Sequence, residues 1–140
     1  MKKKTIYIIG ISTLIFIGAI VGICFFALNF TTTLKNIDLG NEKIPTFYAV
    51  VGKKQIMGFE SNYQNGNITT RINYSPKKVS LEEIKKYFLM LEKNDFILKD
   101  EIDNAAWLYQ KKSEDGSSIL EVEIYFKPGE KFIIIYERYS

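Results

Sequence analysis

The sequence predicts an α+β protein in which an N-terminal transmembrane helix precedes one antiparallel sheet with a single helix packed across it. Three observations predict this: an uncharged apolar run at Ile6–Leu28, the dipeptide Asn65-Gly66 between two alternating segments, and a capped amphipathic stretch after Ser80. The expected element order is β-β-β-α-β-β-β-β. The chain should comprise a basic cytoplasmic tail (residues 1–5), the span (6–28), a polar stalk (29–44) and an extracytoplasmic domain (45–140).

The apolar run contains 23 residues with neither charge nor proline. A helix of that length is roughly 35 Å long and can cross a hydrocarbon core of about 30 Å. Lysines at positions 2–4 precede the run, so the positive-inside rule predicts a cytoplasmic N-terminus and a domain outside the cytoplasmic membrane. The alternatives are a cleaved signal peptide, which has a shorter apolar region, and a lipoprotein signal at Cys24, against which the bulky Ile23 argues.

Gly18 and Gly22 are four residues apart within the predicted span. Small residues at this spacing allow two membrane helices to approach closely, which suggests a homodimer through the span. Glycine is also common in membrane helices, so the alternative is that both are incidental.

Composition limits the classes of function. Of 19 basic residues three lie in the N-terminal tail, so the predicted exported part carries as many basic as acidic residues and lacks the positive charge typical of nucleic-acid binding. The chain has no histidine, and its one cysteine lies in the apolar run. Histidine bases, Cys–His pairs and zinc sites are thereby excluded, and we expect no enzyme activity and no cofactor.

The clearest local signal is Asn65-Gly66, which is typical of a two-residue type I′ hairpin because both positions require positive φ. Pairing Gln64 with Asn67 fixes the register of the strands Gln55–Tyr63 and 68–74. It places side chains opposite one another in the pairs Met57–Tyr74, Phe59–Ile72, Ser61–Thr70 and Tyr63–Ile68, with Glu60 against Arg71 on the other side. An earlier strand is expected at Thr46–Val51, after Pro45.

The helix is expected to begin at Ser80. Ser80 as N-cap with Glu83 three residues later forms a capping box. An apolar stripe at helical spacing follows, and Asn94 is the expected stop, in a left-handed cap. The stripe consists of Leu81, Ile84, Tyr87, Phe88 and Leu91.

Four further strands are expected after the helix. They are Phe96–Lys99, Ala105–Lys112, Ser118–Phe126 and Lys131–Tyr139, with an acidic loop over 100–104. The last contains FIIIY at 132–136, which is apolar on both faces. Such a run is typical of a central strand covered on both sides, or of one whose second face is closed by a partner.

The segments Tyr74-Ser75-Pro76, Ser80–Tyr87 and Leu91–Phe96 with the closing strands resemble small bacterial membrane-anchored or lipoprotein-type extracytoplasmic domains of unknown function. The resemblance covers about residues 68–139. Asp95 stands where that pattern usually has glycine. The resemblance implies a fold and an envelope location, and it supplies no catalytic residue.

Candidate site residues are few. Glu121 and Glu123 share one strand face about 7 Å apart, a spacing usable by a carboxylate-based cell-wall hydrolase, but an outward polar face of an antiparallel strand is the favoured explanation because the sequence indicates no cleft around them. The loop residues Asp100, Glu101, Asp103 and Asn104 offer oxygens without the order of a calcium loop. The aromatic candidates for a binding site are Trp107, Tyr109 and Tyr136, which core packing would also explain.

The sequence therefore favours a non-enzymatic binding or accessory module. It would be anchored in the lipid bilayer by residues 6–28, without nucleic acid, and would contact another component of a bacterial envelope. An immunity-type protein against an exported toxin belongs to the same class. The hydrolase remains the alternative from another class.

Pairing through the span predicts that replacing both glycines, Gly18→Ile with Gly22→Ile, abolishes a detergent-resistant dimer because the helices can no longer approach. Gel migration of the purified full-length chain in mild detergent measures this. A dimer that survives the double substitution would discard pairing through these glycines.

Overall fold

The computed structural model describes residues 13–23 and 35–140. The chain divides into two units, and the second contains all of residues 35–140. Residues 13–23 are helical, with exposed side chains. None of the helices in the described ranges combines the length and the hydropathy that a membrane crossing requires. The predicted span at 6–28 extends beyond the described helix at both ends and stays a prediction, as does the basic tail at 1–5, which lies outside the described residues.

The second unit has an α+β fold with an antiparallel sheet, as predicted. Its elements, in chain order, are β1 (Asn36–Leu39), β2 (Glu42–Pro45), α2 (Phe47–Val51), β3 (Ile56–Gln64), β4 (Asn67–Tyr74), α3 (Leu81–Lys93), β5 (Ile97–Ile102), β6 (Ala106–Lys112), β7 (Ile119–Lys127) and β8 (Lys131–Tyr139).

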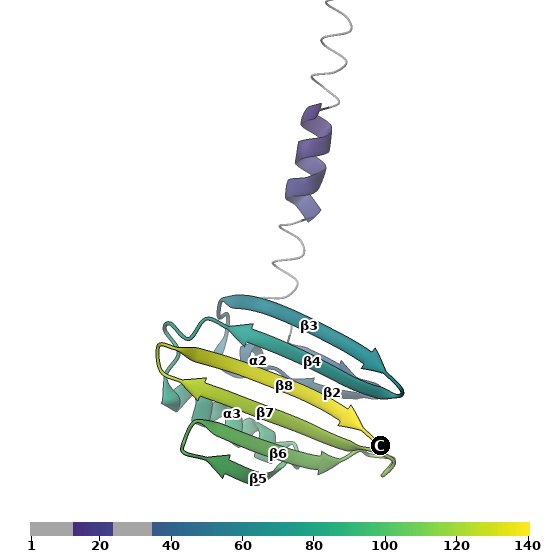
Figure 1. Ribbon diagram of the computed structural model, residues 1–140, viewed down its shortest axis with the longest axis vertical. Helices are drawn as coiled ribbons and strands as arrows, with labels where there is room; N and C mark the ends of the chain where they lie inside the picture. Colours follow the sequence, from purple (N-terminus) through teal and green to yellow (C-terminus); the bar gives the residue numbers. More distant parts are fainter. Residues whose placement is uncertain (1–12, 24–34) are drawn as a thin grey trace, which may run out of the picture. The chain divides into compact units, whose positions relative to one another are not determined.

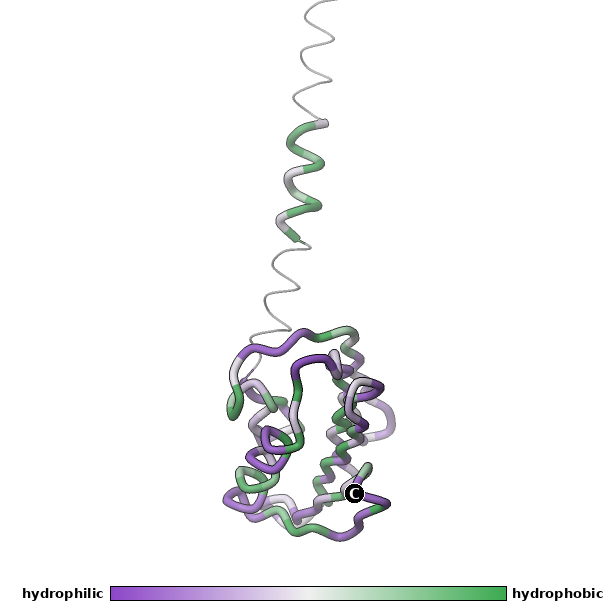
Figure 2. Tube along the Cα trace, turned by 90° about the vertical axis from the view of Figure 1, so that its left-hand side faces the viewer, coloured by the Kyte–Doolittle hydropathy of each residue, from purple (hydrophilic) through white to green (hydrophobic). Residues whose placement is uncertain are grey.

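Six strands form the main sheet in the order β3-β4-β8-β7-β6-β5, and every neighbouring pair is antiparallel. β1 and β2 form a separate two-stranded sheet. Helices α2 and α3 and the β1–β2 hairpin all lie on one side of the main sheet (Figure 1). Seen edge-on, the domain therefore has two layers, the sheet and the elements that cover it (Figure 2). We call the covered side of the sheet the core face and the other side the open face.

The core fills the space between the layers. From α3 it takes the stripe residues Ile84, Tyr87 and Leu91, all buried, whereas Leu81 at the start of the predicted stripe is 40% exposed. The sheet contributes alternate side chains of its central strands. These are Ile72 and Tyr74, Trp107 and Tyr109, Leu120, Val122, Ile124 and Phe126, and Phe132, Ile134 and Tyr136. The alternation follows from the period of two along a strand, which sends every second side chain to the core face.

The capping box at the start of α3 is confirmed. The Ser80 hydroxyl accepts a hydrogen bond from the Glu83 backbone N–H at 3.2 Å, and the Glu83 carboxylate accepts one from the Ser80 N–H at 3.1 Å. At the other end Asn94 is the C-cap, but with φ −100°, and the left-handed residue is Asp95 with φ 68°. The helix therefore ends at Asn94 as predicted, but the prediction that Asn94 is left-handed is wrong.

The hairpin at Asn65-Gly66 is also confirmed. Both residues have positive φ, and Gln64 pairs with Asn67 as expected. The register holds back to Gly58, where a bulge shifts it, so that Ile56 rather than Met57 pairs with Tyr74. A bulge adds one unpaired residue to a strand, and a strict alternation cannot anticipate it.

The segment before this hairpin corrects two expectations. The polar stalk predicted over 29–44 includes β1 and nearly all of β2, whose Ile37, Leu39 and Ile44 are buried. The strand predicted at Thr46–Val51 is the short helix α2. Phe47, Val50 and Val51 recur at helical spacing and pack toward the core, with the Phe47 ring edge-on to Phe132 at 4.8 Å.

The single large sheet expected from seven strands is a six-stranded sheet plus a two-stranded one. β5 begins one residue later than expected and extends through Asp100 and Glu101, for which the sequence predicts an acidic loop. Only Asp103 and Asn104 remain in a turn, both with positive φ. β8 lies inside the sheet, between β4 and β7, as its apolar run indicated.

A buried chain of hydrogen bonds connects the layers. The Tyr87 hydroxyl on α3 donates to the carbonyl of Pro45 at 2.8 Å. The Tyr136 hydroxyl on β8 lies 2.7 Å from that of Tyr87 and receives a backbone hydrogen bond from Phe47. Both hydroxyls are thus satisfied although both side chains are fully buried. Burial also raises the pKa of each tyrosine well above its ordinary value.

Tyr87→Phe should lower the free energy of unfolding of the full chain by about 1–3 kcal/mol, because the Pro45 carbonyl and the Tyr136 hydroxyl then lose a buried partner. Urea denaturation followed by circular dichroism measures this. The control is Tyr63→Phe on β3, whose side chain is 72% exposed. Equal stability of the two variants would contradict a structural role for the hydroxyl chain.

Candidate functional site

The open face is the part of the domain that none of the described helices or strands covers. Side chains that alternate with the core residues of β7 and β8 point to it. On β7 these are Ile119, Glu121, Glu123 and Tyr125, and on β8 they are Ile133, Ile135, Glu137 and Tyr139. This face is the candidate functional site, since three carboxylates of β7 and β8 gather on it.

Three carboxylates form what we call the acidic cluster, Glu121, Glu123 and Glu137. Carboxylate oxygens of the three lie within 4.8 Å of one another. Glu121 and Glu137 are directly opposite each other across β7 and β8, and Glu123 lies two residues along the same strand. Like charges directly opposite in a sheet are destabilising, so the fold places this cluster at an energetic cost.

The carboxylates of the cluster accept hydrogen bonds from neutral side chains and form no ion pairs with the cations of the described residues. Tyr139 and Gln110 both donate to Glu121, and Tyr125 donates to Glu123. A side-chain hydrogen bond from Thr69 reaches Glu137. None of the ion pairs among the described residues includes a member of the cluster. The cluster is therefore stabilised by hydrogen bonds, without a direct ion pair.

The pKa values of the surrounding groups reflect this concentration of carboxylates. Burial, with the charges of Glu123 and Glu121, raises the pKa of Glu137 above its ordinary value. Hydrogen bonds to Glu123 and Glu121 raise the pKa of Tyr125 and of Tyr139 to about 12, because each phenol would ionise beside a carboxylate. Both phenols thus stay protonated donors throughout the neutral range.

Apolar side chains flank the cluster on the same face. Ile135 is the direct neighbour of Glu123 on β8, and Ile133 is the neighbour of Tyr125. Leu108 on β6 pairs with Glu123 from the other side. All three are only partly buried. β8 is thus apolar on both sides, and the described structure closes only one of them.

The chemistry of three close carboxylates suits a positively charged group. An ammonium or guanidinium group would form charge-assisted hydrogen bonds with them. Oxygen donors at this separation also suit a hard divalent cation, which binds oxygens at about 2.0–2.6 Å. For glycoside hydrolysis the pair Glu121 and Glu123 would need a cleft. The hollow beside Glu123 and Tyr125 has a volume of about 120 Å³, below the roughly 300 Å³ at which ordinary ligand pockets begin.

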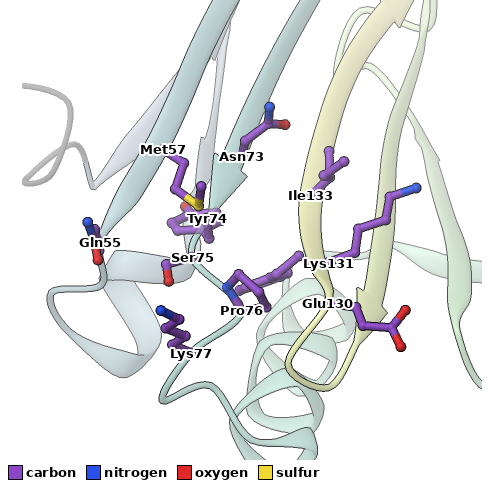
Figure 3. Close-up of a pocket in the computed structure, with 11 residues that line it drawn as sticks. Gln55, Met57, Asn73, Tyr74, Ser75, Pro76, Lys77, Glu130, Lys131 and Ile133 are labelled. Atoms are coloured by element: carbon purple, nitrogen blue, oxygen red, sulfur yellow. The ribbon is translucent and has the colours of Figure 1, made fainter.

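A larger groove of about 560 Å³ lies at one end of β4 and β8. Its polar side chains do not converge on one point: Glu130 and Lys131 are directed away from Ser75 and Lys77 (Figure 3). Lys131 lies over the ring of Tyr125 at 5.0 Å, and Glu130 pairs with Lys127 at 2.8 Å. The groove therefore offers no set of polar groups that converge on a ligand.

The aromatic candidates separate into two groups. Trp107 and Tyr109 are buried against α3, where the Phe88 ring lies 4.9 Å and 5.5 Å from theirs. Their edges line a groove of about 460 Å³ between α3 and β5. Tyr136 is fully buried in the hydroxyl chain and has no access to a ligand. Gly18 and Gly22 lie on the described helix with open space around both.

Glu121 and Glu123 are the members of this site that the sequence pointed to, whereas Glu137, Tyr139 and Gln110 were not predicted. A signal for Glu137 exists in the tight turn between β7 and β8. Pairing Lys127 with Lys131 across that turn places Glu137 opposite Glu121, as observed. Gln110 had no comparable local signal, because the β6–β7 connection is longer and does not fix a register by itself.

Replacing Glu137 should stabilise the protein in a pH-dependent way. The raised pKa of Glu137 means that the folded state favours its protonated form. The favourable contribution of the protonated carboxyl is complete below its ordinary pKa. It is lost as the pH rises through the folded-state pKa and the carboxylate ionises beside Glu121 and Glu123. Glu137→Gln should therefore raise the free energy of unfolding at pH 7.5 by up to about 1 kcal/mol. The gain should vanish below about pH 4.

Urea denaturation of the full chain at both pH values measures the difference, with Glu92→Gln on the exposed side of α3 as the matched control. A destabilised Glu137→Gln protein at pH 7.5 would show that the glutamate is held by a compensating charge.

Comparison with protein-family models, with characterised proteins and with solved structures gives no match to this chain. The likeness to small envelope domains over residues 68–139 rests on the sequence segments alone.

Proposed function

We propose that this protein is a non-enzymatic binding module whose open face captures a positively charged surface of another envelope protein. The observation that carries the proposal is the acidic cluster: three carboxylates that form no ion pair among the described residues, on the central strands β7 and β8, whose uncovered open face also carries half-buried isoleucines.

Both the charge and the partly buried apolar area of the open face favour such a partner. Lysine or arginine side chains of a partner would relieve the repulsion within the cluster, and charge complementarity also speeds association. The half-buried Ile133 and Ile135 would add apolar area around this polar centre. A broad sheet face without a deep pocket suits a protein surface better than a small molecule.

The predicted anchor at residues 6–28 would locate this binding at the membrane surface. Its uncharged run and the flanking lysines support an orientation with the domain outside the cytoplasmic membrane. A tethered module would meet its partner at the membrane surface, where restriction to one plane raises the effective concentration. An immunity-type protein that masks a basic exported toxin is one form of this function.

The alternative remains a carboxylate-based wall hydrolase that uses Glu121 and Glu123. It would require the glutamates to flank a bound glycan at roughly 5–9 Å between carboxyl groups. Binding accounts better for the neutral donors on Glu121 and for the small hollow beside Glu123.

A photo-crosslinking amino acid at Ile135 on the open face should yield a discrete adduct with an envelope protein in living cells. The same group at Leu89, which is 58% exposed on α3, should not. The Ile135 adduct should disappear when Glu121, Glu123 and Glu137 are all changed to Gln, and persist when the exposed Glu82, Glu92 and Glu114 are changed instead. Adducts of equal yield from both positions, or an Ile135 adduct indifferent to the first triple substitution, would refute the proposal.

A further inference from the structure

The two edges of the main sheet differ in how they are protected. β5 has a bulge between Leu98 and Asp100 and carries three consecutive charged residues at 99–101. β3 has its bulge near its start and then pairs regularly with β4 from Gly58 to Gln64. Charges and bulges are the usual protection of an edge strand, and over these seven residues β3 has Glu60 as its single charge.

Exposed aromatic side chains accompany the β3 edge. Tyr63 is 72% exposed and Phe59 37% exposed, and both point to the same side of the sheet because they are four residues apart on one strand. A long regular edge with uncovered aromatic groups is a surface for the addition of another strand.

The hairpin determines which backbone groups of β3 face outward. Gln64 and Asn67 flank the two-residue turn and form a hydrogen-bonded pair. Since hydrogen-bonded and non-hydrogen-bonded pairs alternate, the N–H and C=O groups of Phe59, Ser61 and Tyr63 point away from β4. These groups are the ones that a new strand would bond.

A second copy of β3 satisfies this edge in one register better than in its neighbours. With the two-fold axis at Ser61, Phe59 faces Tyr63 of the second copy and Glu60 faces Asn62, so every residue from 58 to 64 is paired. Moving the axis to Glu60 puts two carboxylates directly opposite each other, which is unfavourable. Moving it to Asn62 removes the partner of Phe59 and shortens the overlap.

We propose that two copies of this chain associate through antiparallel pairing of their β3 strands, with Ser61 on the two-fold axis. The same interface patch on both copies is the arrangement that closed two-fold dimers require. One continuous sheet would then cross both copies, with the two open faces on one side. This inference rests on β3 alone and is independent of what the open face binds.

The test uses the full-length chain with Cys24→Ser, so that an introduced cysteine is the only thiol. In the proposed dimer the two Ser61→Cys residues form a hydrogen-bonded pair with Cα atoms about 5.5 Å apart, within the range a disulfide spans. Copper phenanthroline with oxygen should convert this variant to a covalent dimer. The matched control is Ile97→Cys on the β5 edge, which is 61% exposed.

The Ser61→Cys dimer should form at least about tenfold faster than the Ile97→Cys dimer, because association holds the thiols at an effective concentration in the mM range. Adding Tyr63→Lys should abolish the difference by placing a charge against Phe59, with the circular dichroism spectrum unchanged. Equal rates at Ser61 and Ile97, or a Ser61→Cys rate unaffected by Tyr63→Lys, would overturn the proposal.

The covalent dimer should also form when Gly18→Ile and Gly22→Ile are added to the Ser61→Cys variant. Loss of cross-linking in that variant would attribute association to the span and overturn the proposal.

Discussion

The buried hydroxyl chain from Phe47 through Tyr136 and Tyr87 to Pro45 is the interaction on which the arrangement of the layers depends. It joins the centre of β8, the middle of α3 and the junction between β2 and α2, three parts far apart in the sequence. Each hydroxyl lies between one donor and one acceptor, so two polar groups are buried in an apolar core without an unsatisfied atom. A shift of α3 along the sheet would break both of its hydrogen bonds. These hydrogen bonds therefore fix the position of α3 on the sheet more specifically than the apolar stripe of α3 does, because apolar contacts are non-directional and tolerate sliding.

This fixed layer closes one face of the sheet and leaves the other without a cover among the described elements. β8 shows the consequence most clearly: Ile134 and Tyr136 are fully buried on the core face, while Ile133 and Ile135 are only partly buried on the open face. The acidic cluster sits among these apolar neighbours. Hydrogen bonds from tyrosine, glutamine and threonine make the cluster tolerable without removing its charge. A surface that combines repulsive charge with uncovered apolar area is costly for an isolated domain and useful for association.

A second long-range contact attaches the N-terminal hairpin. Arg138 on β8 donates to the Leu39 carbonyl at 2.8 Å and to the Ser118 hydroxyl at 3.2 Å. Gly40 has positive φ, and a Cβ atom there would come within 2.6 Å of the guanidinium. The turn between β1 and β2 thus requires glycine both for its conformation and for the approach of Arg138. The Arg138 contacts and the hydrogen bond from Tyr87 to the Pro45 carbonyl together attach the two four-residue strands to the rest of the domain.

Local signals in the sequence determined the elements that begin or end at a turn dipeptide or a helix cap. Asn65-Gly66 and the Ser80–Glu83 box fix backbone conformation within four residues, and the two-sided apolar run of β8 marks a central strand, so these predictions were confirmed. Tertiary structure alone decided the hairpin of β1 and β2 and the helix α2, since segments this short become stable only by burying Ile37, Leu39 and Phe47 against residues far along the chain. It likewise decided the site: the sequence paired Glu121 with Glu123 by period, but Glu137 and Gln110 joined them through strand pairing. Proximity across a sheet depends on register between separate strands, and a single strand does not encode it.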